Sequence, residues 1–152
     1  MRVMMFRSAM AVFATTAFLA TGSAVLAETL SFKAELTGFG EVPPVVSNGT
    51  GLVKATLNTE TRALTWTGSY SGLSGKVIGA HFHGPVSYIG TTSEQNAPIQ
   101  VGTSGNLASP FKGTTTLTDT QMRDLRKGRW YFNIHTPAHP SGEIRGPVIE
   151  TD

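Results

Sequence analysis

The chain has 152 residues, no cysteine and a formal net charge of +2 at pH 7. Without thiols it cannot form disulfides or thiolate metal sites, and it cannot carry a lipid on an N-terminal cysteine. The small basic excess does not indicate a nucleic-acid-binding protein. Arg2 and Arg7 supply that excess and precede every acidic residue, so the chain after them carries equal numbers of basic and acidic residues.

The beginning of the chain has the pattern of a secretory signal peptide. Arg2 and Arg7 precede an apolar stretch at residues 9–20. Val25 and Ala27 supply the small residues that a signal peptidase requires at its cleavage site. The apolar stretch is shorter than the ~20 residues of a membrane-spanning helix, and no later segment is longer. We therefore expect a signal peptide over residues 1–27, one domain over residues 28–152, no membrane span, and a periplasmic or secreted location.

Short segments with alternating apolar and polar residues follow along the rest of the chain and predict an all-β fold. Their number and spacing are typical of an antiparallel β-sandwich or barrel. The predicted strands are Thr29–Thr37, Gly51–Asn58, Ala63–Ser69, Lys76–His83, Ile99–Val101, Phe111–Leu117, Arg129–His135 and Glu143–Glu150.

One short helix is predicted at Thr118–Lys127. Thr118 can cap its first turn, and Gln121 stands three residues later, as in a capping box. Basic residues in the last turn and Gly128 directly after it are typical of a helix end. The basic cluster here is therefore explained by the helix rather than by an anionic partner.

Two long connections interrupt the strands. The segment Gly38–Pro44 holds two consecutive prolines, which cannot donate hydrogen bonds within a sheet, and we expect it to join the first two strands. The connection Gly84–Pro98 begins directly after His83, and a loop of this length in a compact domain often has a function.

His81 and His83 stand on either side of one phenylalanine in a predicted strand. Residues two apart in a strand project to the same face, so we expect the two imidazoles side by side. The opposite face of this strand, Ile78, Ala80 and Phe82, is expected to pack against the core.

The predicted strand Arg129–His135 repeats this design. Its apolar row consists of Trp130, Phe132 and Ile134, and its polar row consists of Tyr131, Asn133 and His135. If the two strands are neighbours in one sheet, the imidazoles of His81, His83 and His135 converge.

Converging imidazoles can hold one metal ion. His81 and His83 would supply two ligands at ~2.0–2.1 Å, and His135, or His139 in the loop that follows, would supply a third and leave one position open. Neutral imidazoles without thiolates suit copper or zinc. The alternative is that these histidines face solvent or form hydrogen bonds beneath the Gly84–Pro98 connection, with no metal.

Glu143 and Arg145 share one face of the last predicted strand. They can form an exposed ion pair, which contributes ~0–1 kcal/mol to stability. Alternatively, Glu143 orients a histidine, as carboxylates next to metal ligands do.

Sequence motifs of several enzyme classes are absent. The chain has no Gly-x-Ser-x-Gly nucleophile elbow and no glycine-rich phosphate-binding loop, and no acidic pair stands out as a glycosidase pair. These absences point away from an enzyme.

Three segments together resemble the chordin-type domain, CHRD: LTGFGEVPPV at 36–45, SGLSGKVIGAHFHGP at 71–85 and LRKGRWYFNIHTPAHPSGEIRGPV at 125–148. The resemblance implies an immunoglobulin-like or superoxide-dismutase-like β-sandwich. His139 falls where the family pattern is looser. The motif residues carried over are Glu41, Pro43, Pro44, His81, His83, Asn133, His135, Thr136, Gly142, Glu143, Arg145 and Gly146.

For function, the resemblance implies an extracellular binding module rather than a defined activity. The run GAHFHG is also similar to the copper-ligand strand of copper–zinc superoxide dismutases, but their two-metal site uses more histidines than the four of this chain. We therefore expect an exported, non-enzymatic CHRD binding protein with a surface histidine cluster for copper or zinc. A small mononuclear copper redox protein, and a module that binds a protein partner or matrix without metal, are the alternatives.

Overall fold

The computed structural model describes residues 27–87 and 95–151, so the predicted signal peptide lies outside the described residues except for Ala27. The described chain is an antiparallel β-sandwich, which confirms the predicted fold class. Its strands are β1 (Thr29–Thr37), β2 (Thr50–Asn58), β3 (Ala63–Ser71), β4 (Gly79–His83), β5 (Ile99–Gly102), β6 (Phe111–Thr116), β7 (Tyr131–Thr136), β8 (His139–Pro147) and β9 (Ile149–Thr151).

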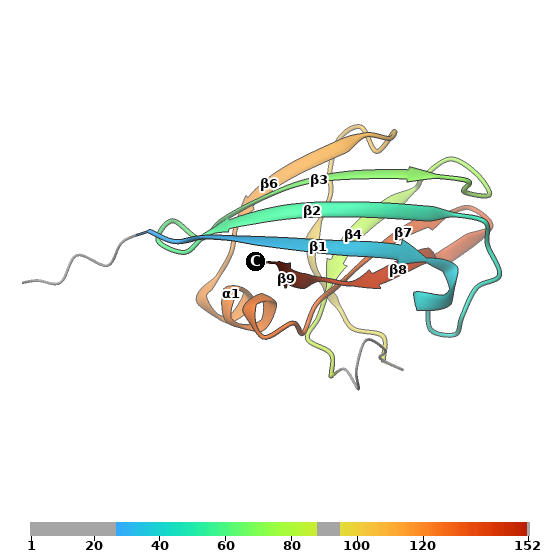
Figure 1. Cartoon of the computed structure of the whole chain (residues 1–152). Coiled ribbons are helices and arrows are strands. Elements are labelled where there is room, and N and C mark those ends of the chain that lie inside the picture. The colour runs from blue at the N-terminus through green and yellow to red at the C-terminus, as the bar shows by residue number, and fades with distance from the viewer. Residues whose placement is uncertain (1–26, 88–94, 152) are drawn as a thin grey trace, which may run out of the picture.

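The strands follow the order β5-β4-β7-β8-β1-β2-β3-β6, and β9 pairs with β1. The strands β6, β3, β2 and β1 run side by side as one layer, and β8, β7 and β4 continue from β1 into the second layer (Figure 1). Because β1 contacts both β2 and β8, the sheet folds over at this strand. The strands β4 and β7, which carry three of the histidines, belong to this second layer.

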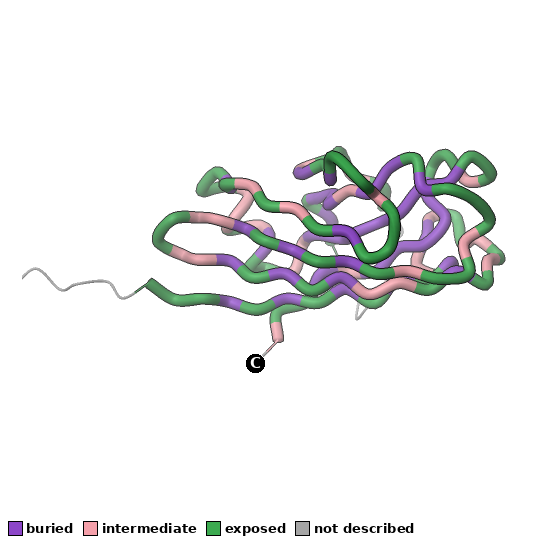
Figure 2. The backbone as a smooth tube through the Cα atoms, turned by 90° about the horizontal axis from the view of Figure 1, so that it is seen from above, coloured by how far each residue is buried: buried purple, intermediate pink, exposed green. Residues whose placement is uncertain are grey.

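The predicted alternation holds best in the first layer. Buried and exposed residues alternate without interruption along β1, the strand that follows the grey N-terminal trace in Figure 2. One face of this layer therefore packs inward while the other meets solvent, as expected for an antiparallel sheet.

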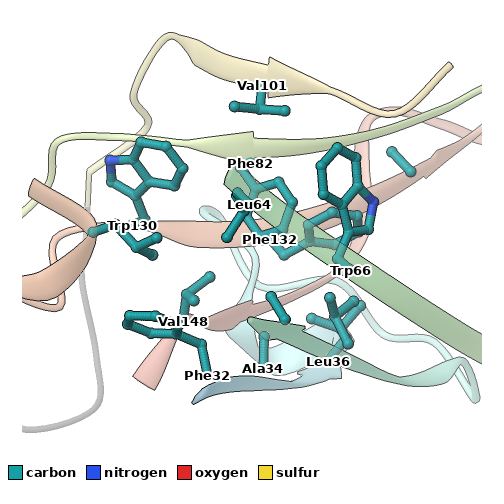
Figure 3. Packing of buried hydrophobic residues seen from close by; sticks show 14 of the residues in the cluster. Phe32, Ala34, Leu36, Leu64, Trp66, Phe82, Val101, Trp130, Phe132 and Val148 are labelled. Carbon is teal, nitrogen blue, oxygen red and sulfur yellow. The ribbon is translucent and has the colours of Figure 1, made fainter. Parts of the chain in front are cut away.

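Aromatic rings fill the space between the layers (Figure 3). Phe82 meets Trp66 edge-on at a centroid distance of 5.3 Å and Phe132 edge-on at 4.7 Å. Edge-to-face pairs at such distances add to the free energy gained by burial. The prediction that Phe82 and Phe132 face the core is confirmed, since both are fully buried.

The prediction that Ile78 packs against the core is wrong, because this side chain is 55 % exposed and Val77 is buried in its place. The regular ladder between β4 and β7 begins at Gly79. The alternation that holds within β4 therefore does not extend back to residue 78.

The one α-helix of the described residues, α1 (Asp119–Arg126), lies where the sequence predicts a helix over Thr118–Lys127 and is one residue shorter at each end. Thr118 accepts a hydrogen bond from the backbone of Gln121, and the Gln121 side chain accepts one from the backbone of Thr118. No helix in the described part of the chain is both long and apolar enough to cross a membrane.

The strand β7 is buried on both faces, which the alternating sequence did not predict. Its polar row is covered by the connection between β1 and β2, which contains the short 3₁₀ helix η1 (Gly38–Gly40), and by residues 95–98. The side-chain amide of Asn96 donates to the carbonyl of Val42 at 3.0 Å and so joins the two covering segments. The candidate site therefore lies beneath these segments rather than on an open sheet face.

Candidate metal centre

The pairing of β4 with β7 brings three histidines together. Gly79 lies opposite His135, and His81 lies opposite Asn133, so His135 stands diagonally across from His81. Nδ1 of His81 is 3.0 Å from Nε2 of His135. One ligand atom from each of His81, His83 and His135 lies within 4.8 Å of the other two. The predicted convergence of these imidazoles is confirmed.

A glycine leaves room for the rings. A Cβ atom at Gly79 would lie 2.9 Å from Cε1 of His81 and 3.5 Å from Cδ2 of His135. Any side chain here would force the His81 ring to move. The absence of a side chain at Gly79 therefore allows the His81 ring to lie beside His135.

Two of the histidines have their tautomer fixed by the backbone. Nδ1 of His83 is 2.7 Å from the carbonyl oxygen of Ala97, and Nδ1 of His135 is 3.0 Å from the carbonyl oxygen of Pro140. A carbonyl can only accept, so each Nδ1 carries the proton and donates. Each ring therefore presents an unprotonated Nε2, as metal-binding histidines with backbone partners do.

The surroundings favour the neutral imidazole. Burial, together with the neighbouring rings of His135 and His83, lowers the pKa of His81 to about 4. Burial also lowers the pKa of His83 and of His135, although the hydrogen bonds to Ala97 and Pro140 act in the opposite direction. All three rings are thus in the form that binds metal ions at neutral pH.

The geometry fits a metal ion with small adjustments. Two nitrogens bound to one tetrahedral ion lie about 3.3 Å apart. The His81 Nδ1–His135 Nε2 distance of 3.0 Å is close to this value. The ligand atom of His83 lies within 4.8 Å of the other two and must approach by up to about 1.5 Å to complete a three-nitrogen site with one open position.

His139 does not belong to this cluster. It begins β8, pairs with Thr136 across the turn, and lines a separate hollow of about 250 Å³ together with Glu41 and Pro140. The group of three in the described residues is therefore His81, His83 and His135.

Arg145 and Tyr131 form the wall beside His83. The Tyr131 ring stacks on His83 with a centroid distance of 4.8 Å, and the guanidinium carbon of Arg145 lies 3.4 Å from the Tyr131 centroid. Arg145 also donates to the backbone oxygen of Gln95 at 2.8 Å and to Oδ1 of Asn96 at 3.1 Å. This stack fixes residues 95–97, and with them the carbonyl that orients His83.

The prediction of an exposed Glu143–Arg145 ion pair is wrong, because Glu143 is fully buried and Arg145 is only 3 % exposed. Glu143 accepts hydrogen bonds from the hydroxyls of Ser47 at 2.7 Å, Ser74 at 2.6 Å and Thr136 at 2.6 Å, and from the Ser74 backbone at 2.8 Å. No histidine of the described chain donates to it. Glu143 therefore holds three segments of backbone together instead of orienting a metal ligand.

A model of the CHRD domain family matches residues 32–148. The chain belongs to the CHRD domain family. This confirms the predicted resemblance, and the match includes every histidine of the cluster as well as Glu41, Asn133, Glu143 and Arg145. Comparison with curated proteins found no match, and comparison with solved structures found none either.

Glu41 and Asn133 of this CHRD domain are two further polar residues whose burial the sequence did not reveal. They are 5 % and 3 % exposed. Burial raises the pKa of Glu41 to about 7, although the charge of Arg145 and hydrogen bonds from Asn133 and Val42 lower it. A Cβ atom at Gly142, whose φ is +133°, would overlap the Glu41 carboxyl group. This overlap shows how tightly the carboxyl group is enclosed.

Proposed function

We propose that this CHRD domain is an exported, non-catalytic binding module that holds one zinc or copper ion through His81, His83 and His135. The observation that carries the proposal is the orientation of His83 and His135. Both rings donate their Nδ1 protons to backbone carbonyls, which leaves both Nε2 atoms unprotonated, and one ring nitrogen of each lies within 4.8 Å of the other and of His81.

The metal-free alternative explains only part of this geometry. Without metal, His81 can donate from Nδ1 to Nε2 of His135, which satisfies both atoms. Nε2 of His83, however, is buried and has no hydrogen bond of good geometry among the described residues, although the Asn133 side chain lies near enough to raise the pKa of this ring. A buried, unpaired acceptor costs about 1–3 kcal/mol, and a bound cation removes this cost. The geometry therefore favours a metal site over a purely structural histidine cluster.

Three nitrogen donors and the lack of a thiolate favour Zn²⁺ or Cu²⁺ over softer ions. An ion held in this way keeps one coordination position for a further ligand, such as water or a group from a partner. When bound, the ion would act as a Lewis acid toward that further ligand. The protein's own residues supply the neutral imidazoles and the covering backbone that limits access of water.

Export is part of the proposal. The signal-peptide pattern of residues 1–27 supports it, and we propose that the mature protein consists of residues 28–152 as one CHRD domain. Sequencing the N-terminus of the exported protein tests this directly. A mature protein that still begins at Met1 would contradict it.

Calorimetric titration of the purified mature protein with ZnCl₂ and with CuCl₂ tests the metal site. We expect about one ion per chain, and His83→Ala and His135→Ala each to weaken binding at least about tenfold. His139→Ala is the matched control, because this histidine lies outside the cluster, and it should bind as the wild type does. Binding that survives His83→Ala but not His139→Ala would contradict the proposal.

A superoxide assay separates the binding module from a copper redox protein. We expect the copper-loaded domain to show no turnover above that of free copper. Turnover that disappears in His83→Ala would instead support the redox alternative. If neither ion binds, the remaining alternative is a module for a protein partner or matrix.

A further inference from the structure

The outer face of β2 and β3, which points away from the core, carries a strip of exposed hydroxyl groups. Two hollows, of about 450 Å³ and about 400 Å³, follow one another along these strands. On β3 every second residue from position 65 to position 71 is an exposed threonine or serine, so the row of hydroxyls extends over roughly 20 Å. This hydroxyl strip consists of Thr65, Thr67, Ser69 and Ser71 of β3 and of Thr50 and Thr56 of β2.

Several hydroxyls of the strip are free to bind a ligand. Thr65 pairs with Thr114 of β6 at 3.2 Å. The hydroxyls of Thr56, Thr67 and Ser69, by contrast, form no hydrogen bond within the described chain. Threonine is common on exposed strand faces because its branched side chain suits a pleated surface. The hydroxyls alone therefore do not identify a ligand, and the charges beside them decide.

Three lysines follow one row across the same face. Lys33 and Lys54 line the larger hollow and lie directly opposite each other on β1 and β2. Lys112 lies opposite Thr67, one strand further along the row. Lys33 is 3.1 Å from Glu35, whereas neither of the other two lysines forms an ion pair within the described chain. Like charges directly opposite each other destabilise a sheet, so this row disfavours folding and favours an anionic ligand.

The other side chains of the hollows narrow the class of anion. Bases of single-stranded nucleic acids stack on exposed aromatic rings, but Phe32 and Trp66 turn into the core, and Tyr70 is half-buried with its hydroxyl donating to a backbone carbonyl. Attachment to a lipid surface requires a row of apolar side chains, and Leu52 is the one outward-facing apolar side chain that lines the hollows. Hydroxyls in a line beside lysines match a chain of sugars that carries carboxylates.

We propose that the outer face of β2 and β3 binds a linear polysaccharide that carries carboxylate groups. The polysaccharide lies along the two strands, where its hydroxyls exchange hydrogen bonds with the hydroxyl strip. Its carboxylates accept hydrogen bonds from Lys54 and from the lysines on either side of it. The core separates this face from the histidine cluster, so the binding goes beyond the proposed metal site and does not depend on it.

Calorimetric titration of the purified mature protein with a polygalacturonate oligomer tests the proposal. The fully methyl-esterified oligomer is the uncharged control, because it keeps the sugar chain and lacks the carboxylates. We expect the acidic oligomer to bind, to bind more weakly as NaCl rises from about 50 mM to about 500 mM, and the ester not to bind at the same concentrations. Equal binding of the two oligomers, or no binding of either, would overturn the proposal.

Surface variants locate the site. Lys54→Gln should weaken binding about three- to fivefold, and Thr67→Val, which removes one hydroxyl at constant shape, about threefold. Lys127→Gln is the matched control, since it removes an exposed lysine at the end of α1, away from this face. His83→Ala should also bind as the wild type does, which keeps the outcome separate from that of the metal site. An unchanged affinity in Lys54→Gln, or an equal loss in Lys127→Gln, would overturn the proposal.

Polyglutamate and a DNA duplex separate the polysaccharide from other polyanions. Both carry negative charges along a chain, but neither presents sugar hydroxyls in the way that polygalacturonate does. We expect both to bind more weakly than polygalacturonate of similar length in the same salt. Tighter or equal binding of polyglutamate would assign the face to an acidic protein segment, and tighter or equal binding of DNA would assign it to nucleic acid. Either result would overturn the proposed ligand class.

Discussion

Glu143 and Glu41 are the two buried carboxyl groups of the described chain, and their surroundings are opposite. Glu143 accepts four hydrogen bonds from Ser47, Ser74 and Thr136, and although burial raises its pKa, these bonds outweigh burial and lower it to about 2. Glu41 has an oxygen without any partner, and burial raises its pKa to about 7. Similar burial therefore gives a stable anion in one place and a weak acid in the other.

The difference shows which region of this CHRD domain is built for stability. A fully satisfied buried carboxylate rigidifies the segments that donate to it. Buried groups that lack partners lower stability, and natural proteins retain such groups mainly at functional sites. The region around Glu143 is therefore structural, whereas the region of Glu41, Asn133 and His83 is the one that adjoins the proposed binding site.

The largest expected effect comes from removing the satisfied carboxylate. Glu143→Ala leaves several buried donors without an acceptor, and we expect a loss of about 3–5 kcal/mol in the free energy of unfolding at pH 7. Urea denaturation measures this loss. Glu35→Ala is the control, because Glu35 is exposed and pairs only with Lys33, and it should change stability by less than about 1 kcal/mol. Similar losses in both variants would break the contrast between the two buried glutamates.

A smaller, pH-dependent effect is expected at Glu41. The folded protein binds this proton more tightly than the unfolded chain, because the pKa rises from 4.5 to about 7 on folding. The free energy of unfolding of the wild type, measured relative to that of Glu41→Gln, should therefore be constant below about pH 4.5. It should fall by on the order of 3 kcal/mol as the pH rises to about 7 and be constant above that.

Urea denaturation of both proteins over this pH range measures the difference. The lowered pKa values of the histidines make stability rise with pH between about 4 and 6.5 in both proteins, so their contribution cancels in the comparison. A difference between the two proteins that is independent of pH, or that rises with pH, would show that Glu41 is an ordinary carboxylate.

The smallest effect concerns one donor to Glu143. Ser47→Ala removes one of the four hydrogen bonds to Glu143, at 2.7 Å, and also the acceptor of the Gly49 backbone amide, at 2.9 Å, so we expect a loss of about 1–2 kcal/mol in the free energy of unfolding. Ser71→Ala, at an exposed position, serves as the control and should have almost no effect. A loss as large as that of Glu143→Ala would mean that Ser47 itself, and not the shared carboxylate, holds these segments.

Local patterns were sufficient to predict most of the fold. The alternation in Thr29–Thr37 gave the exact bounds of β1, and the capping pattern at Thr118 placed α1 within one residue at each end. The convergence of His81, His83 and His135 followed from the two-residue period of a strand and the assumption that two strands are neighbours. Each of these features depends on residues close together in the sequence or on one pairing.

Features that depend on distant segments could not be predicted. Glu143 meets Ser47 and Ser74, which are 96 and 69 residues away, so no local pattern shows that it is buried and satisfied. The carbonyl of Ala97 that orients His83 belongs to the backbone and leaves no mark on residue type. The cover over the polar row of β7 likewise comes from two connections that the sequence identified only as long loops.

An anomalous difference map from crystals of the mature protein grown with one equivalent of ZnCl₂, recorded at the zinc absorption edge, tests the central claim most directly. We predict one peak about 2.0–2.1 Å from a ring nitrogen of each of His81, His83 and His135. A peak at His139, or no peak within reach of these three rings, would contradict it.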